Sequence, residues 1–191
     1  MGEEQQRRAL RRYETIIATL VGVSALFVSG YTAYVQRQQL RAAVWPILEF
    51  NSSNEPHVRL SLDNKGVGPA IVRHVKVTVD AQPVRNWHDA LQKLLGPGRH
   101  SFSESTMTGH VLSAGESMNI LVPHSDEGKP LTSEKSDPLY AAADEARKRV
   151  GIEICYCSTL GECWTVRSDG SSSSTVSTRT CPGPSATTFE Q

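Results

Sequence analysis

The stretch from Thr15 to Val35 constrains this chain most, because its 21 residues carry no charge. A helix of this length spans about 30 Å, which matches the hydrocarbon thickness of a bilayer. Four Arg precede the stretch in RRALRR, and two follow it. An excess of Arg marks the cytoplasmic flank of such a helix. We therefore expect a single-pass transmembrane helix with a helical extension at residues 13–45, a cytoplasmic basic segment at 1–12, and the rest of the chain outside.

A cleaved signal peptide is the alternative interpretation of this segment. Val28 and Gly30 provide small residues at a cleavage site. However, the apolar region of a signal peptide is usually about 7–15 residues long, and this one is longer. The sequence thus favours an uncleaved signal-anchor that contacts the lipid bilayer through residues 13–35.

Small residues recur along one face of the expected helix. They are Ala18, Gly22, Ala25, Ser29 and Ala33. Such a face allows close approach of a second helix, which favours a homo-oligomer or a protein partner of unknown identity. Small residues are also common in membrane helices in general, so the pattern has an ordinary interpretation as well.

The charge distribution argues against a nucleic-acid partner. Beyond residue 45 the chain has 14 basic and 17 acidic residues, so this part is mildly acidic. Nucleic-acid surfaces need clustered Lys and Arg to displace counterions.

The part of the chain from 46 to 169 has the pattern of a mainly β domain. Apolar and polar residues alternate in 57–63, 71–80 and 118–123, and Gly, Pro and Asn separate these stretches. Two short helices are expected within 86–98, capped by Asn86, and within 137–151, capped by Asp137. The spacing favours an antiparallel immunoglobulin-like β-sandwich with two inserted helices. Residues 170–191 are rich in Ser, Thr, Gly and Pro, which predicts a disordered tail.

The segments RAAVWPILEF, LDNKGVGPA and YCSTLGECW, together with the anchor, resemble a group of uncharacterised single-pass proteins of Gram-negative bacteria. The NKGVGPA turn is also similar to turns in bacterial immunoglobulin-like domains of the CARDB type. The resemblance implies an inner-membrane protein whose domain faces the periplasm. It implies no catalytic residue and no cofactor.

The sequence contains no pattern that is typical of a catalytic site. NKGVGPA lacks the Lys and Ser or Thr of a phosphate-binding loop and is followed by a strand, so we expect a sharp turn in which glycine supplies a positive φ. The six histidines are dispersed, without a spacing that would place two imidazoles on one helix face. We therefore predict a protein that is not an enzyme.

The cysteines are the remaining chemical feature. In a strand from Gly151 to Ser158, Cys155 and Cys157 lie on one face. A three-residue loop ending at Gly161 places Cys157 directly opposite Cys163, at a separation suited to a disulfide. Cys155 and Cys181 are then left over, and they pair if the tail folds back.

Two other interpretations of the cysteines stay open. A metal site needs four converging thiolates, but the spacing lacks the C-x2-C pairs typical of zinc sites. A thiol oxidoreductase usually carries C-x-x-C at a helix N-terminus. The leading hypothesis is a non-catalytic, membrane-anchored periplasmic interaction or assembly module. The alternative is a thiol- or metal-dependent envelope factor that uses Cys155, Cys157, Cys163 and Cys181.

Overall fold

The structure is a computed structural model that describes residues 2–125, 127–132, 138–169, 172–185 and 188–190. The predicted helix cap Asp137 lies outside these ranges. So do a few positions of the predicted basic segment and of the predicted tail, namely residues 1, 170–171, 186–187 and 191. The chain divides into two compact units, residues 1–43 and residues 44–191.

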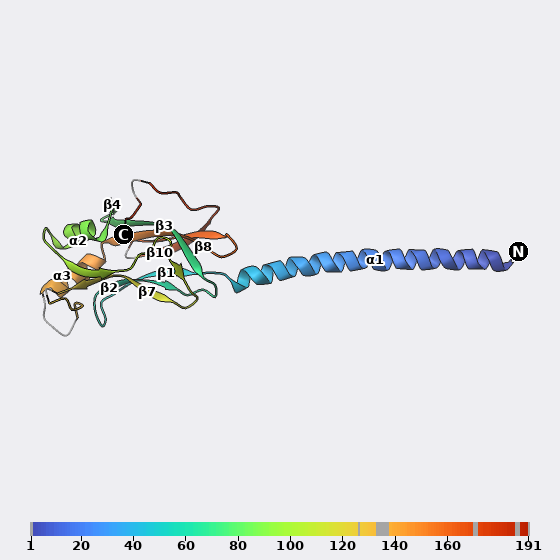
Figure 1. Cartoon of the computed structure of the whole chain (residues 1–191), viewed down its shortest axis with the longest axis horizontal. Coiled ribbons are helices and arrows are strands. Elements are labelled where there is room, and N and C mark those ends of the chain that lie inside the picture. Colours follow the sequence, from blue (N-terminus) through green and yellow to red (C-terminus); the bar gives the residue numbers. More distant parts are fainter. Residues whose placement is uncertain (1, 126, 133–137, 170–171, 186–187, 191) are drawn as a thin grey trace. The chain divides into compact units, whose positions relative to one another are not determined.

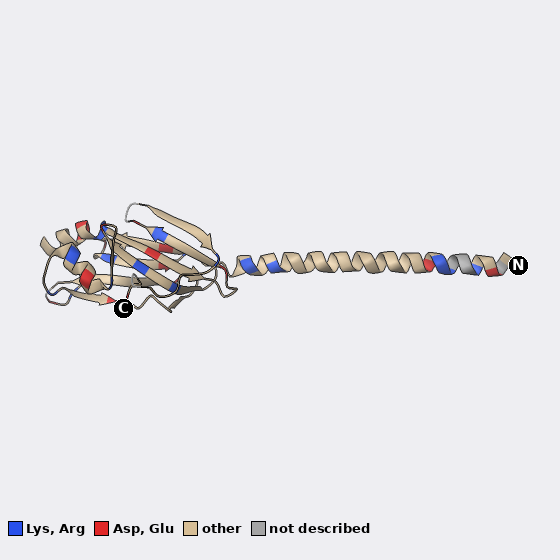
Figure 2. Cartoon of the chain, turned by 90° about the horizontal axis from the view of Figure 1, so that it is seen from above, with Lys and Arg blue, Asp and Glu red and all other residues tan. Residues whose placement is uncertain are grey.

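The first unit is one helix, α1, which spans Gly2–Ala43 (Figure 1). It is long and apolar enough to cross a membrane, a property that signal sequences share, and its apolar stretch is not buried. Charged residues lie toward its two ends and leave its middle uncharged (Figure 2). The helix begins before the predicted start at residue 13 and ends two residues before the predicted end at 45.

The second unit contains two antiparallel sheets. The four-stranded sheet has the order β1 (Leu48–Ser53), β2 (Arg59–Asn64), β7 (Ser117–His124) and β5 (Ser101–Glu104). The six-stranded sheet has the order β10 (Ser173–Thr178), β9 (Cys163–Ser168), β8 (Val150–Cys157), β3 (Ala70–Val79) and β4 (Gln82–Val84), and β6 (Val111–Leu112) also pairs with β3. Helix α2 is Trp87–Leu95, with Asn86 as its N-cap, and α3 is Pro138–Arg147.

One hydrophobic core joins the two sheets. Alternate residues of β8, such as Ile152, Ile154 and Tyr156, point into this core and pack with Leu60 and Leu62 of β2. The Tyr156 hydroxyl accepts a hydrogen bond from the backbone N–H of Leu48 at 3.3 Å. The other face of β8 therefore carries Cys155 and Cys157 away from the core.

The side chain of Asn64 connects three segments of the domain. Its side chain is fully buried. The amide nitrogen donates to the carbonyl oxygens of Gly68 at 2.8 Å and of Leu112 and Ser113 at 3.1 Å. The amide oxygen accepts from the N–H groups of Ile47 at 3.3 Å and Gly66 at 3.0 Å. A single amide thus holds the entry segment, the turn after β2 and the end of β6 together.

The glycines after Asn64 have a different role from the one expected. Gly66 and Gly68 are not among the residues with positive φ. Instead, a Cβ on Gly66 would lie 2.4 Å from the backbone of Trp45, and one on Gly68 would lie 2.2 Å from the backbone of Val44. The turn needs glycine because the entry segment passes directly against it. The same contact explains why the helix stops early, since the Trp45 carbonyl accepts from Val67 instead of continuing a helix.

The C-terminal segment differs from the predicted disordered tail. Strand β10 pairs with β9 along its whole length. Farther on, the Phe189 N–H donates to the carbonyl of Val75 at 3.0 Å, and the Phe189 ring, 2% exposed, packs edge-to-face on Trp87 at 5.0 Å. We call residues 179–185 and 188–190 the strap, because they hold Cys181, which is bonded to Cys155 of β8, and Phe189, which contacts Val75 of β3. Low apolar content indicated disorder, but a few specific contacts order the described part.

Replacing Asn64 with Ala should lower the free energy of unfolding by at least about 3 kcal/mol, because several buried backbone groups lose their partner at once. Urea unfolding of the full chain in detergent, followed by tryptophan fluorescence, measures this. Asn51→Ala is the matched control, since Asn51 is only partly buried and its amide makes one hydrogen bond, at 2.7 Å to Asp63. An equal loss in the two variants would contradict the role assigned to Asn64.

Replacing Phe189 with Ala should lower the free energy of unfolding by about 3–5 kcal/mol, because it leaves a cavity beside Trp87. Val176→Ala in the same C-terminal segment should change it by no more than about 0.5 kcal/mol, because an exposed side chain loses little on truncation. Val176 is 58% exposed. Calorimetric melting of both variants gives the comparison, and a neutral Phe189→Ala would show that the ring does not secure the strap.

Candidate functional site

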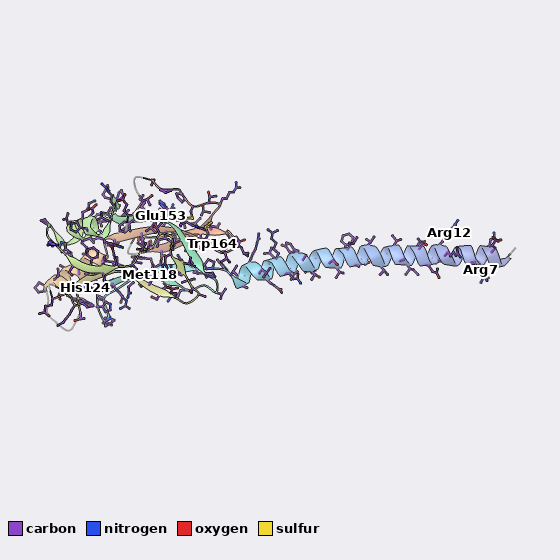
Figure 3. All side chains as sticks on the ribbon, in the orientation of Figure 1. Arg7, Arg12, Met118, His124, Glu153 and Trp164 are labelled. Carbon is purple, nitrogen blue, oxygen red and sulfur yellow. A yellow bond between two sulfur atoms is a disulfide. The ribbon has the colours of Figure 1, made fainter. Side chains whose placement is uncertain are left out.

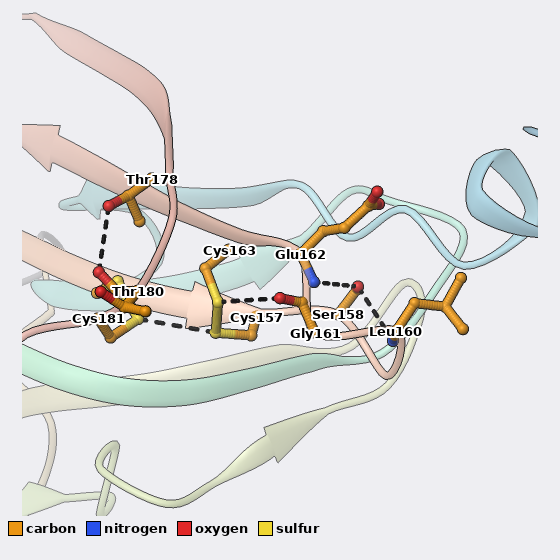
Figure 4. Close-up of a disulfide and its surroundings, with 10 residues drawn as sticks. Cys157, Ser158, Leu160, Gly161, Glu162, Cys163, Thr178, Thr180 and Cys181 are labelled. Atoms are coloured by element: carbon orange, nitrogen blue, oxygen red, sulfur yellow. Dashed lines mark hydrogen bonds between the residues drawn. A yellow bond between two sulfur atoms is a disulfide. The ribbon is translucent and has the colours of Figure 1, made fainter.

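The hairpin between β8 and β9 positions the first pair of cysteines. The Ser158 N–H donates to the Glu162 carbonyl at 2.7 Å, and the Gly161 N–H donates to the Ser158 carbonyl at 3.1 Å. Gly161 has a φ of 78°, the left-handed conformation that favours glycine. The Ser158 hydroxyl, 3% exposed, accepts from the N–H groups of Leu160 and Glu162 (Figure 4). Sequence reasoning found the glycine but missed this serine, whose hydroxyl fastens the turn.

Cys157 and Cys163 are joined by a disulfide across this hairpin. They are direct partners in the register, with Cα atoms 4.0 Å apart. This is the pairing that the spacing and the turn predicted. Both residues are 8% exposed, so the bond lies just below the surface.

A second disulfide joins Cys155 to Cys181 and ties the strap to β8. The two disulfides touch, since the Sγ atoms of Cys157 and Cys181 are 3.8 Å apart (Figure 4). The Sγ atoms of Cys157, Cys163 and Cys181 all lie within 4.8 Å of one another. Because all four cysteines form disulfides, none offers the thiolate that a soft metal ion requires.

His74 is the buried histidine nearest to this cluster in the strand register. A bulge in β3 between Val72 and His74 places His74 opposite Cys155 of β8. His74 is 6% exposed. The bulge explains why strict alternation could not assign its face.

The other histidines do not gather around the cysteines. His57 and His124 belong to the part of the domain near Leu131, and burial, Arg59 and His124 lower the pKa of His57. His124 lies in β7 of the four-stranded sheet, whereas β8, which carries Glu153 and two of the cysteines, belongs to the six-stranded sheet (Figure 3).

A groove of about 610 Å³ lies on the six-stranded sheet, at the end of β8 and β9 that is farther from the disulfide hairpin. Its charges are largely paired. Arg167 donates to Glu153 at 2.8 Å, and Arg149 pairs with Asp80. The hydrogen bond from Arg149 lowers the pKa of Asp80 and keeps it ionised. These groups are arranged as structural ion pairs.

On the four-stranded sheet, Asp63 is a further perturbed carboxylate. Partial burial raises its pKa, but hydrogen bonds from Ser117, Lys65 and Asn51 outweigh burial and lower it. The carboxylate therefore stays ionised and links β1, β2 and β7.

The small residues of α1 are exposed along the helix. The exposed residues of this face are Ala18, Gly22, Ala25, Ser29 and Ala33. The Ser29 hydroxyl donates to the Ala25 carbonyl at 2.8 Å, so its polar group is satisfied within the helix.

Among the described residues, the group with the clearest chemistry is the pair of touching disulfides. Such bonds exchange with thiolates, and a thiolate released from one of them would lie in contact with the other. Comparisons with protein-family models, curated proteins and solved structures found no match to this chain.

Proposed function

We propose that this protein is a membrane-anchored periplasmic module for interaction or assembly, without catalytic activity. In this proposal α1 is an uncleaved inner-membrane anchor with its N-terminus in the cytoplasm. The domain is an immunoglobulin-like β-sandwich. The observation that carries the proposal is that all four cysteines, in the unit after an apolar helix, form disulfides. Disulfides persist in oxidising compartments, so they support placement outside the cytoplasm.

The domain has a surface suited to binding. Strand β10 lies at the edge of the six-stranded sheet, and most of its residues are exposed, including Val176. An edge strand offers backbone N–H and C=O groups to an added strand. A protein segment that binds in extended conformation is therefore the kind of partner that fits.

The shifted carboxylates have structural hydrogen bonds that account for their pKa values. The carboxylates with lowered pKa values, Asp63, Asp80 and Glu116, have separate hydrogen-bond partners. A lowered pKa suits a permanent acceptor rather than a general acid.

The touching disulfides favour a second candidate function, the thiol-dependent envelope factor. The alternative of a metal-dependent factor would need the same cysteines in reduced form. The two candidates share the anchor and the compartment and differ in the chemistry of the cluster.

Single added cysteines test the membrane topology. In spheroplasts of a Gram-negative host, a membrane-impermeant maleimide should label Val176→Cys at once, because the domain lies outside. It should label Gln5→Cys only after lysis. Both native side chains are exposed, so accessibility within the protein does not bias the pair. The reverse pattern, or equal labelling of both, would contradict the proposed topology.

The small-residue face can be tested by a pair of identical substitutions. Ser29→Ile should reduce self-association or partner capture, measured by chemical cross-linking in lipid vesicles or native membranes, because it blocks close helix approach. Ser24→Ile is the control, since position 24 lies on the opposite side of the helix at 3.6 residues per turn. If both variants behave like the unmodified chain, this face makes no contact.

A further inference from the structure

The contact between the two disulfides has a chemical consequence of its own. The 3.8 Å between the Sγ atoms of Cys157 and Cys181 is a direct non-bonded contact. A thiolate released at Cys157 would therefore already touch the Cys155–Cys181 bond. Thiol–disulfide exchange begins with attack of a thiolate on a disulfide sulfur, and this contact supplies the approach.

Access differs between the sulfur-bearing residues. Cys155 is 1% exposed, whereas Cys157 and Cys163 are each 8% exposed, next to an exposed turn with Leu160 at 53%. An external thiol therefore reaches the hairpin disulfide more easily than the Cys155 side of the second bond. The Cys181 side of the second bond is partly exposed, so the contact between the two bonds, and not burial, favours exchange within the cluster.

We propose that the two disulfides form a thiol–disulfide exchange relay that accepts electrons from an external dithiol. A thiolate of the dithiol attacks Sγ of Cys163. A mixed disulfide forms, the Cys157–Cys163 bond breaks, and Cys157 leaves as a thiolate. This thiolate attacks Sγ of Cys181, so that a Cys157–Cys181 bond forms, the Cys155–Cys181 bond breaks, and Cys155 leaves and takes up a proton.

The second thiol of the reagent completes the reaction. It attacks its own sulfur in the mixed disulfide and releases Cys163, which takes up a proton. The dithiol is oxidised to a disulfide, and the protein gains two electrons and two protons as the thiols of Cys155 and Cys163. One protein disulfide remains, now Cys157–Cys181.

The relay moves the attachment point of the strap. Cys155 and Cys157 are two positions apart on β8, which is about 7 Å along a strand. The strap would then be tied nearer to the hairpin turn, and a thiol at Cys155 would lie opposite His74. Because the Sγ atoms of Cys157 and Cys181 already lie 3.8 Å apart, the new bond forms with little movement of the strap.

Variants with three cysteines test the relay in the purified full chain in detergent. In Cys163→Ser, Cys157 is a free thiol from the start. After equilibration at mildly alkaline pH, acid quenching, alkylation and peptide mapping should find a Cys157–Cys181 disulfide with alkylated Cys155. Cys157→Ser is the matched control, and it should form at least about tenfold less Cys163–Cys181 disulfide, because the positioned thiol reacts preferentially.

Two results would overturn the relay. One is a Cys163→Ser protein that retains only Cys155–Cys181 and is alkylated only at Cys157. The other is equal exchange in both variants. Should either variant misfold, limiting dithiothreitol on the unmodified chain gives an independent answer, since the first one-disulfide species should contain Cys157–Cys181. Finding only the two native disulfides among those species would contradict the proposal, whatever the topology or partner of the protein.

Discussion

The buried amide of Asn64 is the interaction on which the arrangement of the domain depends. A buried amide must have its donors and acceptor satisfied, or it costs the folded state several kcal/mol. Asn64 satisfies them with five backbone groups, which come from three segments of the chain. Those segments therefore keep fixed positions relative to β2, and Gly66 and Gly68 leave the space in which the entry segment packs. The start of β1 and the end of β6 follow from this contact.

The six-stranded sheet has a second constraint on its other face. Its core-facing residues Ile152, Ile154 and Tyr156 are held by apolar packing against the second sheet. The opposite face of β8 carries Cys155 and Cys157, which the strap covers through a disulfide. The face that other β domains leave to solvent is here occupied by the end of the same chain. The sulfur cluster lies where hairpin and strap meet.

Local patterns predicted those features that depend on neighbouring residues. The alternation in 57–63, 71–80 and 118–123 located β2, β3 and β7, and the loop ending at Gly161 located the hairpin pair Cys157 and Cys163. Features set by distant contacts were missed. The roles of Gly66 and Gly68 depend on a segment about 20 residues earlier in the chain. Likewise, β10 forms because β9 offers it an edge, which no local property of a Ser- and Thr-rich stretch indicates.

The C-terminal segment is held by a disulfide as well as by apolar burial. Ordering a residue costs about 1–2 kcal/mol of backbone entropy. Burial of one Phe side chain returns about 1.5–3 kcal/mol, which offsets only a few residues. A disulfide that closes a loop of 26 residues contributes about 3–4 kcal/mol, which is more than that ring contributes. Because apolar burial alone is too small to order the strap, the position of the strap also depends on the disulfide that joins Cys181 to β8.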